Sequence, residues 1–191
     1  MSATNRGGPR VPADNYPTPT WCVQRLLEAV DLPGGEWLEP AVGEGAIIQA
    51  TDREDVTWTA VDVRPEAVQS VAGLVTDDRL YQGDFLSLTT AGTFEPKTFS
   101  VVLTNPPYRQ AMEYVQACLP LAGTVVMLLR LSFLATKGRY EFMNSTKPDV
   151  HILASRPCFV NGKSDSSEYG WFIWRDEPPT EGRHTWLAPK S

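Results

Sequence analysis

The tetrapeptide Asn105-Pro106-Pro107-Tyr108 directly follows an apolar run and combines residues that could hold a planar amino group. Consecutive prolines fix φ and lack N–H donors, so the strand before them has to end at Asn105. The Asn105 side-chain oxygen and the Pro106 carbonyl then form a pair of acceptors, with Tyr108 as a flat wall beside them. Two acceptors on the hydrogens of an aromatic amine would make its nitrogen more nucleophilic as the transition state forms. The alternative is a rigid turn after a buried strand.

Three further polar groups follow predicted strands. Gly43 and Gly45 come after the first strand, and glycine lets a ligand approach the backbone closely. Asp62 lies near the end of the second strand, where a carboxylate can accept both hydroxyls of a ribose. Asp84, followed by Phe85, ends the third and offers an acceptor beside an aromatic face that suits adenine. Each group alone could be a tight turn or a loop acid, but ligands of open α/β sheets bind at the carboxyl ends of strands. Together the groups predict a pocket for an adenosine-containing cofactor without a phosphate cradle.

Alternating strand and helix patterns predict how these groups are positioned. Strands are expected over residues 36–40, 56–63, 79–86, 98–104, 124–134, 149–155 and 169–175, and helices over 21–30, 46–50, 64–72, 109–122 and 138–144. This alternation is typical of the α/β class, here with a mostly parallel seven-stranded sheet and helices on both faces. No helix separates the last two strands, so they are expected to form an antiparallel pair at one edge.

The chain of 191 residues is long enough for one sizeable core. We expect a flexible lead-in over residues 1–15, a single catalytic domain over 16–175 and a tail over 176–191. No apolar stretch approaches the roughly 20 residues of a membrane-spanning helix, and residues 1–15 lack the apolar region of a secretory signal. Cys22, Cys118 and Cys158 are widely spaced in apolar surroundings, which indicates buried, reduced thiols in a cytoplasmic protein. The two histidines lie away from any cysteine pair, so no metal site is expected.

Charge is unevenly distributed along the chain. The net charge is −6, yet residues 97–163 hold 8 Lys and Arg against 3 Asp and Glu, whereas residues 1–96 hold 6 against 15. The basic segment begins just before the Asn-Pro-Pro-Tyr group, as binding of an anionic polymer would require. Ordinary scatter of surface charge is the alternative.

In their order along the chain, the segments LEPAVGEGA, VDVRPE, GDFL and NPPY resemble the S-adenosylmethionine-dependent amino-methyltransferases. The likeness is greatest to the N6-adenine DNA methyltransferases, and the segment Asp14–Glu28 resembles an additional N-terminal motif of that family. The resemblance covers most of the chain, from about Tyr16 to Trp174. It implies a class I methyltransferase fold, which is Rossmann-like, and S-adenosyl-L-methionine as the cofactor.

The same resemblance implies a role for each matching residue. The cofactor-binding residues are Tyr16, Thr18, Glu39, Pro40, Ala41, Gly43, Gly45, Asp62, Val63, Asp84, Phe85 and Asn105. Thr18 and the segment 39–45 would contact the methionine moiety, Asp62 the ribose, and Asp84 with Phe85 the adenine. Asn105, Pro106, Pro107 and Tyr108 form the catalytic group, in which Tyr108 would stack on the target base.

The loop that joins the last two predicted strands carries candidates for DNA binding. By resemblance, Phe159 would pack against a base flipped out of the duplex, and Arg156 and Lys163 would contact phosphates. Ordinary packing of Phe159 and solvated loop charge are the alternatives. A separate target-recognition domain does not fit in the chain, which resembles the small phage- and prophage-type members. A second copy or a partner subunit would then supply recognition. Adenine in RNA, a protein glutamine and a non-catalytic role remain alternative functions.

Overall fold

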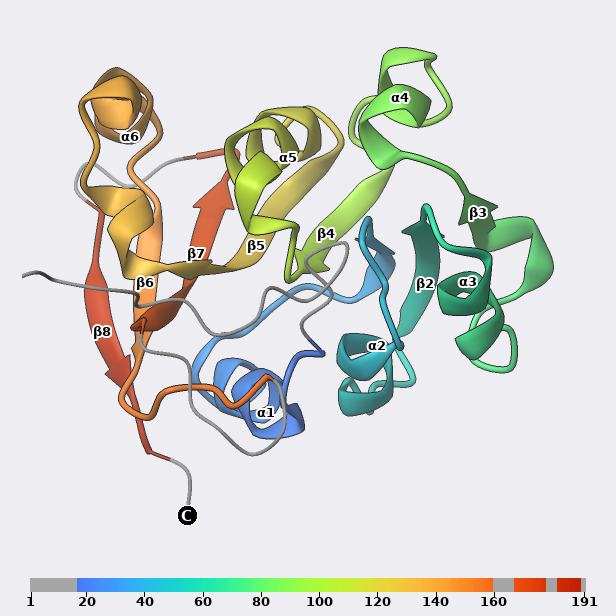
Figure 1. The fold of residues 1–191 in the computed structure, drawn as a ribbon, viewed down its shortest axis with the longest axis horizontal. Helices are drawn as coiled ribbons and strands as arrows, with labels where there is room; N and C mark the ends of the chain where they lie inside the picture. Colours follow the sequence, from blue (N-terminus) through green and yellow to red (C-terminus); the bar gives the residue numbers. More distant parts are fainter. Residues whose placement is uncertain (1–16, 160–166, 178–181, 190–191) are drawn as a thin grey trace, which may run out of the picture.

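An eight-stranded sheet with helices on both faces forms the frame of the molecule (Figure 1). The computed structural model describes residues 17–159, 167–177 and 182–189. Its strands are β1 (Gly35–Glu39), β2 (Val56–Asp62), β3 (Leu80–Gln82), β4 (Phe99–Thr104), β5 (Ala122–Arg130), β6 (Asp149–Leu153), β7 (Tyr169–Arg175) and β8 (His184–Leu187). Their order across the sheet is β3-β2-β1-β4-β5-β7-β6-β8, with β1 to β5 parallel and β7 antiparallel to both of its neighbours. The predicted α/β class and the antiparallel β6–β7 pair are confirmed.

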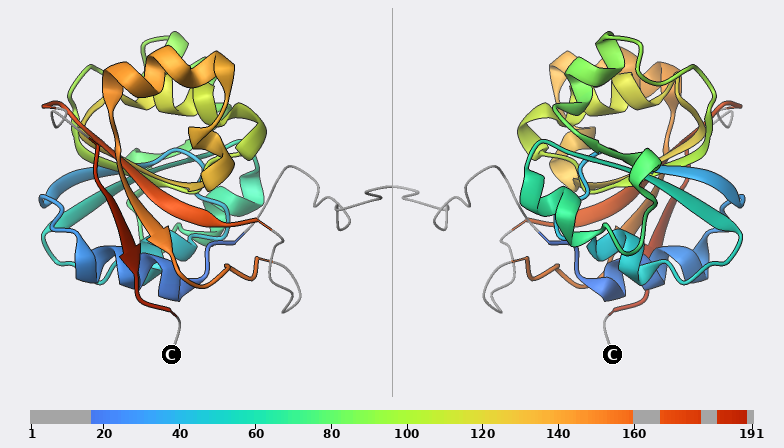
Figure 2. Two further views of the ribbon diagram at one scale, coloured as in Figure 1. Left: turned by 90° about the vertical axis from the view of Figure 1, so that its left-hand side faces the viewer. Right: turned by 90° about the vertical axis from the view of Figure 1, so that its right-hand side faces the viewer.

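The helices divide between the two faces of the sheet (Figures 1 and 2). One face is covered by α1 (Thr20–Ala29), α2 (Ala46–Ala50) and α3 (Pro65–Ser70). The other is covered by α4 (Phe85–Thr90), α5 (Ala111–Cys118) and α6 (Tyr140–Thr146). Four 3-10 turns complete the connections, namely η2 (Asp77–Arg79), η3 (Tyr108–Gln110), η4 (Leu131–Leu134) and η5 (Lys137–Arg139).

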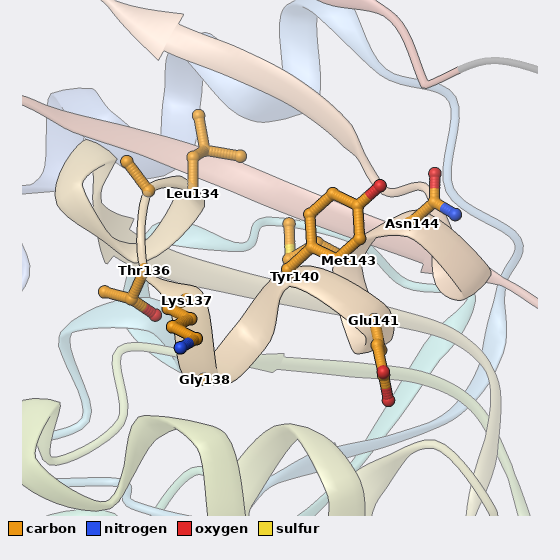
Figure 3. Close-up of a pocket in the computed structure, with 9 residues that line it drawn as sticks. Leu134, Thr136, Lys137, Gly138, Tyr140, Glu141, Met143 and Asn144 are labelled. Carbon is orange, nitrogen blue, oxygen red and sulfur yellow. The ribbon is translucent and has the colours of Figure 1, made fainter.

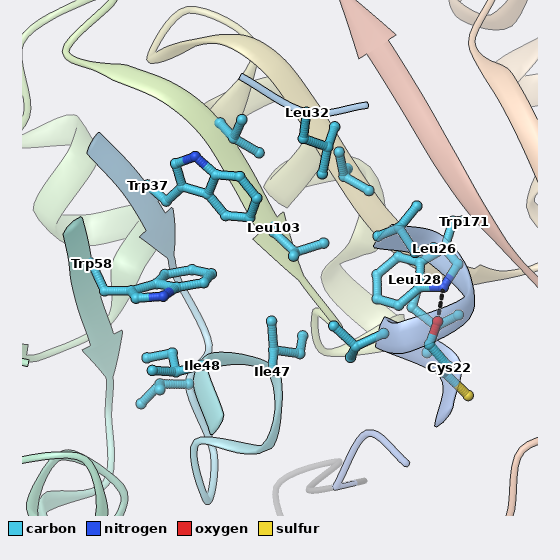
Figure 4. Close-up of a cluster of buried hydrophobic side chains, with 14 of the residues drawn as sticks. Cys22, Leu26, Leu32, Trp37, Ile47, Ile48, Trp58, Leu103, Leu128 and Trp171 are labelled. Carbon is cyan, nitrogen blue, oxygen red and sulfur yellow. Dashed lines mark hydrogen bonds between the residues drawn. The ribbon is translucent and has the colours of Figure 1, made fainter. Parts of the chain in front are cut away.

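Large side chains of the central strands fix α1 and α2 to their face of the sheet (Figure 4). Trp37, Leu103 and Trp171 project from β1, β4 and β7 into one buried cluster with Leu26 and Ile47. The Trp171 indole N–H donates a hydrogen bond of 3.0 Å to the Cys22 carbonyl, so its polar atom is satisfied inside the core. Removing a buried tryptophan of this kind typically lowers the free energy of unfolding by about 3–5 kcal/mol. The strands whose ends carry the predicted site are therefore held rigidly.

Two strands, β3 and β5, each end four residues before the predicted end of their apolar run. β3 stops at Gln82, because the Asp84 carboxylate accepts a hydrogen bond of 2.8 Å from the Ser87 amide and caps α4. β5 stops at Arg130, and the apolar residues that follow it form η4. In both places a local turn ends the strand although the hydrophobic run continues.

The segment after Arg175, where the sequence predicts a tail, adds an eighth strand. β8 pairs in parallel with β6, so the β6–β7 pair does not form the edge of the sheet as predicted. Asp149 anchors the new strand, since its carboxylate accepts from the Arg183 amide at 3.0 Å and forms ion pairs with the Arg175 and Arg183 side chains. The predicted seven strands are thus eight.

The cysteines differ from expectation at one position. Cys22 and Cys118 are buried, and burial raises the pKa of both thiols, whereas Cys158 is exposed. Within residues 17–159, 167–177 and 182–189, no helix is long and apolar enough to span a membrane. The same ranges hold no group of three or more His, Cys, Asp or Glu side chains arranged to hold a metal.

Candidate active site

The order of the strands brings the predicted polar groups together at one edge of the sheet. β3, β2, β1 and β4 are consecutive neighbours, and all four are parallel, so their carboxyl ends lie side by side (Figure 1). The Gly83 amide donates to the Asp62 carbonyl at 2.9 Å, and the Gly43 amide donates to the Asp62 carboxylate at 2.9 Å. Leu38 lies opposite Val102, which places Asn105 just beyond the end of the strand that neighbours the glycine loop.

Asp62 is the most highly hydrogen-bonded group of this edge. Its side chain is 7% exposed, and its Oδ2 accepts from the Gly43 amide at 2.9 Å and from Arg64 Nη2 at 3.2 Å. Its Oδ1 accepts from the Arg64 amide at 3.0 Å and from Arg64 Nε at 3.1 Å. Asp62 is therefore a buried carboxylate with donors on both oxygens.

Glu39, the last residue of β1, is a second acid at the same edge. Its side chain is only 2% exposed, and its Oε2 has no hydrogen-bond partner among the described residues. Burial, and secondly the nearby Asp62 charge, raise the pKa of Glu39 well above its usual range. A buried polar atom left without a partner is costly, which makes it a candidate for contact with a ligand.

The glycine loop after β1 has a backbone that favours glycine. Gly43 and Gly45 both lie in the left-handed region, with φ of 56° and 76°. A Cβ on Gly45 would lie 2.4 Å from Cγ1 of Val71, so packing within the protein already accounts for that glycine. Pro40 and Ala41 form the turn that leads into this loop. Val63 follows Asp62 and is 60% exposed, which leaves an apolar side chain open beside the carboxylate.

Asp84 and Phe85 do not form the predicted strand end with an open aromatic face. Asp84 caps α4 with its carboxylate. The Phe85 ring is fully buried, with ring centroids of Tyr114 and Phe94 at 5.2 and 6.2 Å. The ring thus belongs to the core rather than to the wall of a pocket. Burial is the largest factor that raises the pKa of Tyr114, followed by the charge of Asp84.

The Asn-Pro-Pro-Tyr group sits at the end of β4, as predicted. Thr104 ends the strand and is fully buried, Pro106 is buried, and Asn105 is half-buried. The Pro107 carbonyl accepts from the Gln110 amide at 2.9 Å, which starts the 3-10 turn that carries Tyr108. The turn is rigid, and it lies at the same edge as Asp62 and the glycine loop.

Tyr108 belongs to an aromatic cluster that sequence reasoning only partly identified. Its ring centroid lies 5.6 Å from that of Tyr169, which lies 5.1 Å from that of Phe159. The Arg130 guanidinium lies 5.1 Å from the Tyr108 ring centroid, and its Nε donates to the Tyr169 hydroxyl at 3.0 Å. Phe159 is 8% exposed and packs in the core, which favours the packing alternative for this residue.

Arg130 and Tyr169 were missed by the sequence analysis. Arg130 is the last residue of β5, so it occupies the same position on its strand as the polar groups of β1, β2 and β4. A charged residue inside an otherwise apolar run was the available signal. Tyr169, the first residue of β7, comes from a distant segment and gives no such signal.

The remaining predicted residues are Thr18, Tyr16, Lys163 and Arg156. Thr18 is buried just before α1, while Tyr16 and Lys163 lie outside the described residues. Arg156 is exposed and pairs with the exposed Glu168 at 2.5 Å. Two other cations of the basic segment also have partners: Lys97 pairs with Asp176, and Arg139 Nε donates to the Phe133 carbonyl at 2.9 Å. Each of these three cations therefore has a partner within the protein.

A depression of about 840 Å³ lies elsewhere, over the segment between η4 and α6 (Figure 3). Its lining includes Lys137, Tyr140, Glu141 and Asn144 and contains none of the predicted catalytic or cofactor-binding residues. The lining thus includes neither Gly43 and Gly45 nor Asp62 and Asn105. We therefore place the candidate active site at the strand ends and not in this depression.

No model of a known protein family matches the sequence, and no curated protein is significantly similar to it. Solved structures share its fold. A protein from Pyrococcus horikoshii assigned as an RNA methyltransferase has a TM-score of 0.62 and 15% identity, over 90% of this chain and 92% of that chain. A dimethyladenosine transferase from Plasmodium falciparum has a TM-score of 0.59 and 15% identity, over 84% and 62%. The chain has a class I methyltransferase fold.

A methyltransferase fold also occurs in a larger protein that is similar to this chain. The modification subunit of an assigned type I restriction enzyme from Vibrio vulnificus has a TM-score of 0.61 and 15% identity, over 85% of this chain and 45% of that chain. The present chain thus spans less than half of that subunit. At these identities the similarities establish the architecture, and the chemistry has to be argued from the residues at the site.

Proposed function

We propose that this protein transfers a methyl group from S-adenosylmethionine to the N6 amine of adenine in DNA. The observation that carries the proposal is the position of Asn105-Pro106-Pro107-Tyr108 at the end of β4, beside the glycine loop of β1. A planar amine held there lies at the same edge of the sheet as Asp62 and Glu39. The fold supports methyl transfer in general, because solved structures that share it include S-adenosylmethionine-dependent methyltransferases.

The residues of the strand ends fit this cofactor. The unpartnered Oε2 of Glu39 is a buried acceptor suited to the amino group of the methionine moiety. In this proposal Asp62 accepts the ribose hydroxyls, and the exposed Val63 offers an apolar contact for the adenine ring. Thr18 and the Gly43 backbone complete the proposed set. The cofactor, when bound, supplies a methyl group activated by a positively charged sulfur.

The chain's own contribution to the reaction is positioning and electrostatics. The Asn105 side-chain oxygen and the Pro106 carbonyl accept hydrogen bonds from the two amine hydrogens, which raises the electron density on the nitrogen. No ionised base is needed before the transfer, because the amine is neutral. Tyr108 holds the target base by stacking, and Arg130 lies against that ring. A base in duplex DNA has to be flipped out of the stack to reach the pair of acceptors.

Adenine in RNA is the second candidate substrate. Two structures that share the fold favour it, an assigned RNA methyltransferase and a dimethyladenosine transferase. A protein glutamine presents an equally planar amide and forms a third possibility within the same chemistry. For the DNA substrate, we propose that a second copy or a partner subunit takes part in target recognition, since one structure that shares the fold is itself a subunit of an assigned restriction enzyme.

A methyl-transfer assay across substrates tests the proposal. S-adenosylmethionine with a labelled methyl group is incubated with unmethylated double-stranded DNA, single-stranded DNA, RNA and glutamine-containing peptides. We expect label in DNA, recovered as N6-methyl-2′-deoxyadenosine after digestion to nucleosides. Label in RNA or peptide alone would overturn the DNA assignment and keep the chemistry. Binding of the cofactor without transfer to any substrate would favour a non-catalytic role.

A further inference from the structure

The acceptor positions of Asp62 are fully used by the protein itself. A carboxylate offers about four lone-pair sites, two on each oxygen, and Asp62 receives four donors. Two are backbone amides, those of Gly43 and Arg64, and two are Nε and Nη2 of the Arg64 side chain. The guanidinium fork places one side-chain donor on each oxygen. The cofactor site in the proposed function needs those same positions.

A ribose diol presents two donors in a similar arrangement. Two vicinal hydroxyls that bind one carboxylate also place one donor on each oxygen. The backbone amides of Gly43 and Arg64 can keep their hydrogen bonds to Asp62, because neither bond involves the Arg64 side chain. Binding of the diol therefore replaces the two hydrogen bonds from the Arg64 guanidinium with two from the ribose hydroxyls.

We propose that Arg64 gates the adenosine pocket, because its side chain occupies the ribose-binding positions of Asp62 and has to swing away when a ligand with a ribose diol binds. This inference rests on the proposed function only in taking the pocket to bind an adenosine ligand. The gate gives the buried Asp62 charge a partner when no ligand is bound, and it weakens ligand binding by competition.

The structure also provides places to which Arg64 can move. Arg64 is half-buried, and its neighbours Glu44 and Glu66 are both exposed. The hydrogen bond to Asp62 is the largest factor that raises the pKa of Arg64, and the charges of Glu66 and Glu44 contribute in the same direction. The guanidinium can thus rotate toward one of these acids and stay paired after it leaves Asp62.

Arg53 offers a matched control at the opposite end of β2. Its Nε donates to Oδ1 of Asp55 at 2.9 Å, and its Nη2 donates to Oδ2 at 2.6 Å, so it forms the same fork with an acid two residues away. That pair lies at the amino end of the strand, away from the candidate site. Arg53→Ala removes an equivalent fork without opening the pocket.

The test measures binding by calorimetry for the wild type, Arg64→Ala, Arg64→Lys and Arg53→Ala. The ligands are S-adenosylhomocysteine, adenosine and 2′,3′-dideoxyadenosine. We expect Arg64→Ala to bind the two diol-containing ligands about tenfold more tightly, and Arg64→Lys to lie between it and the wild type. Dideoxyadenosine should show no gain, and Arg53→Ala should match the wild type throughout.

Arg64→Lys keeps a positive charge beside Asp62, so it tests the gate if Arg64→Ala does not fold. Equal or weaker binding of S-adenosylhomocysteine by both Arg64 variants would overturn the gate while leaving the cofactor assignment intact. Binding by an Arg64 variant but not by the wild type would support a tightly closed gate. If none of the proteins binds any adenosine ligand, the pocket in the proposed function and the gate are both wrong.

Discussion

Strand β2 carries an Arg–Asp pair at each end, and the two pairs differ in almost everything except their spacing. At the amino end, Asp55 has a side chain that is 59% exposed and pairs with Arg53. At the carboxyl end, Asp62 is 7% exposed and accepts backbone amides as well as its arginine. An exposed pair contributes little to stability because water screens it. A buried carboxylate instead depends on its hydrogen-bond donors, because an unpaired buried charge is costly. A ligand that displaces one of these donors therefore meets a strong acceptor.

The contrast extends to the two edges of the sheet. The amino-end edge holds further paired charges, among them Arg79 with Glu36 and Lys97 with Asp176. The carboxyl-end edge holds Glu39 and Thr104, which are buried and each have a side-chain oxygen without a partner among the described residues. The charged groups of the amino-end edge thus pair with one another, whereas the carboxyl-end edge has buried polar atoms that a ligand could hydrogen-bond. Substitutions at the two edges should therefore affect different properties.

The largest expected difference concerns the two ends of β4. Asn105→Ala removes one of the two proposed acceptors, and we expect the methyl-transfer rate to fall about 100- to 1,000-fold, as for the loss of one preorganised partner in other active sites. Binding of S-adenosylhomocysteine should stay within about twofold, since the pocket itself is unchanged. Single-turnover kinetics and calorimetry measure the two quantities separately.

Ser100→Ala is the control for that variant. Ser100 lies near the amino end of β4, and its hydroxyl donates to the Glu36 carbonyl at 2.9 Å. It should transfer methyl groups at the wild-type rate. An Asn105→Ala protein that turns over normally would show that Asn105 does not hold the amine.

The ends of β2 provide the second comparison. Asp62→Asn replaces one acceptor oxygen with a donor, so it loses a charge-assisted hydrogen bond to the ribose, and we expect affinity for S-adenosylhomocysteine to fall about 10- to 100-fold. Asp55→Asn changes the exposed acid at the other end and should leave the affinity unchanged. Calorimetric titration of the two variants with S-adenosylhomocysteine measures this difference. Equal affinities of Asp62→Asn and Asp55→Asn would mean that the ribose does not bind at Asp62.

Sequence patterns predicted the carboxyl-end edge better than they predicted the sheet as a whole. The end of β4 before Asn105 was predicted correctly and the end of β2 to within one residue, because the apolar runs stop there at residues that cannot continue a strand or that favour a turn. β3 was too long in the prediction, because Asp84 and Ser87 form a helix cap within a segment read as a strand. That cap is a local pattern, and an Asp three residues before a Ser could have indicated it.

Other features could not be read from local sequence. β8 exists because residues 184–187 pair with β6 and because Asp149 binds Arg183, and both contacts join distant segments. The partners of Asp62 depend on the rotamer that Arg64 adopts, which no spacing rule determines. Arg130 and Tyr169 meet only because β5 and β7 are neighbours in the sheet. The core, in contrast, follows from the apolar runs alone.

Tyr108 tests whether the aromatic cluster serves the target base. Tyr108→Ala removes a ring on which a base can stack, and we expect kcat/KM for DNA to fall about tenfold or more, given that stacking on one aromatic side chain is worth roughly 1–3 kcal/mol per base. Tyr108→Phe keeps the ring and should retain most of the activity. Steady-state kinetics at constant salt measure both variants. Similar losses in the two would indicate a role for the hydroxyl instead of stacking.

Glu39 gives the smallest expected effect and the most direct test of the difference between the edges. Burial raises the pKa of Glu39, so the folded protein holds this proton more tightly than the unfolded chain does. Stability from the neutral form is complete below the unfolded pKa of about 4.5 and declines as the pH rises toward the folded pKa. The hydrogen bond from Arg53 lowers the pKa of Asp55, so the contribution of Asp55 has the opposite sign and is lost as the pH falls.

Glu39→Gln keeps the shape of this side chain and stays neutral at every pH. Its free energy of unfolding should equal that of the wild type near pH 4 and exceed it near pH 7, by about 1.4 kcal/mol for each unit by which folding raises the pKa of Glu39 within that range. Chemical denaturation at several pH values measures the difference. Asp55→Asn should show a gap of the opposite sign, because it is less stable than the wild type near pH 7 and approaches it as the pH falls. Parallel pH profiles for the wild type and Glu39→Gln would mean that water or a neighbouring donor already satisfies Glu39. A more stable Glu39→Gln protein that binds S-adenosylhomocysteine less tightly would show that this edge of the sheet gives up stability for binding.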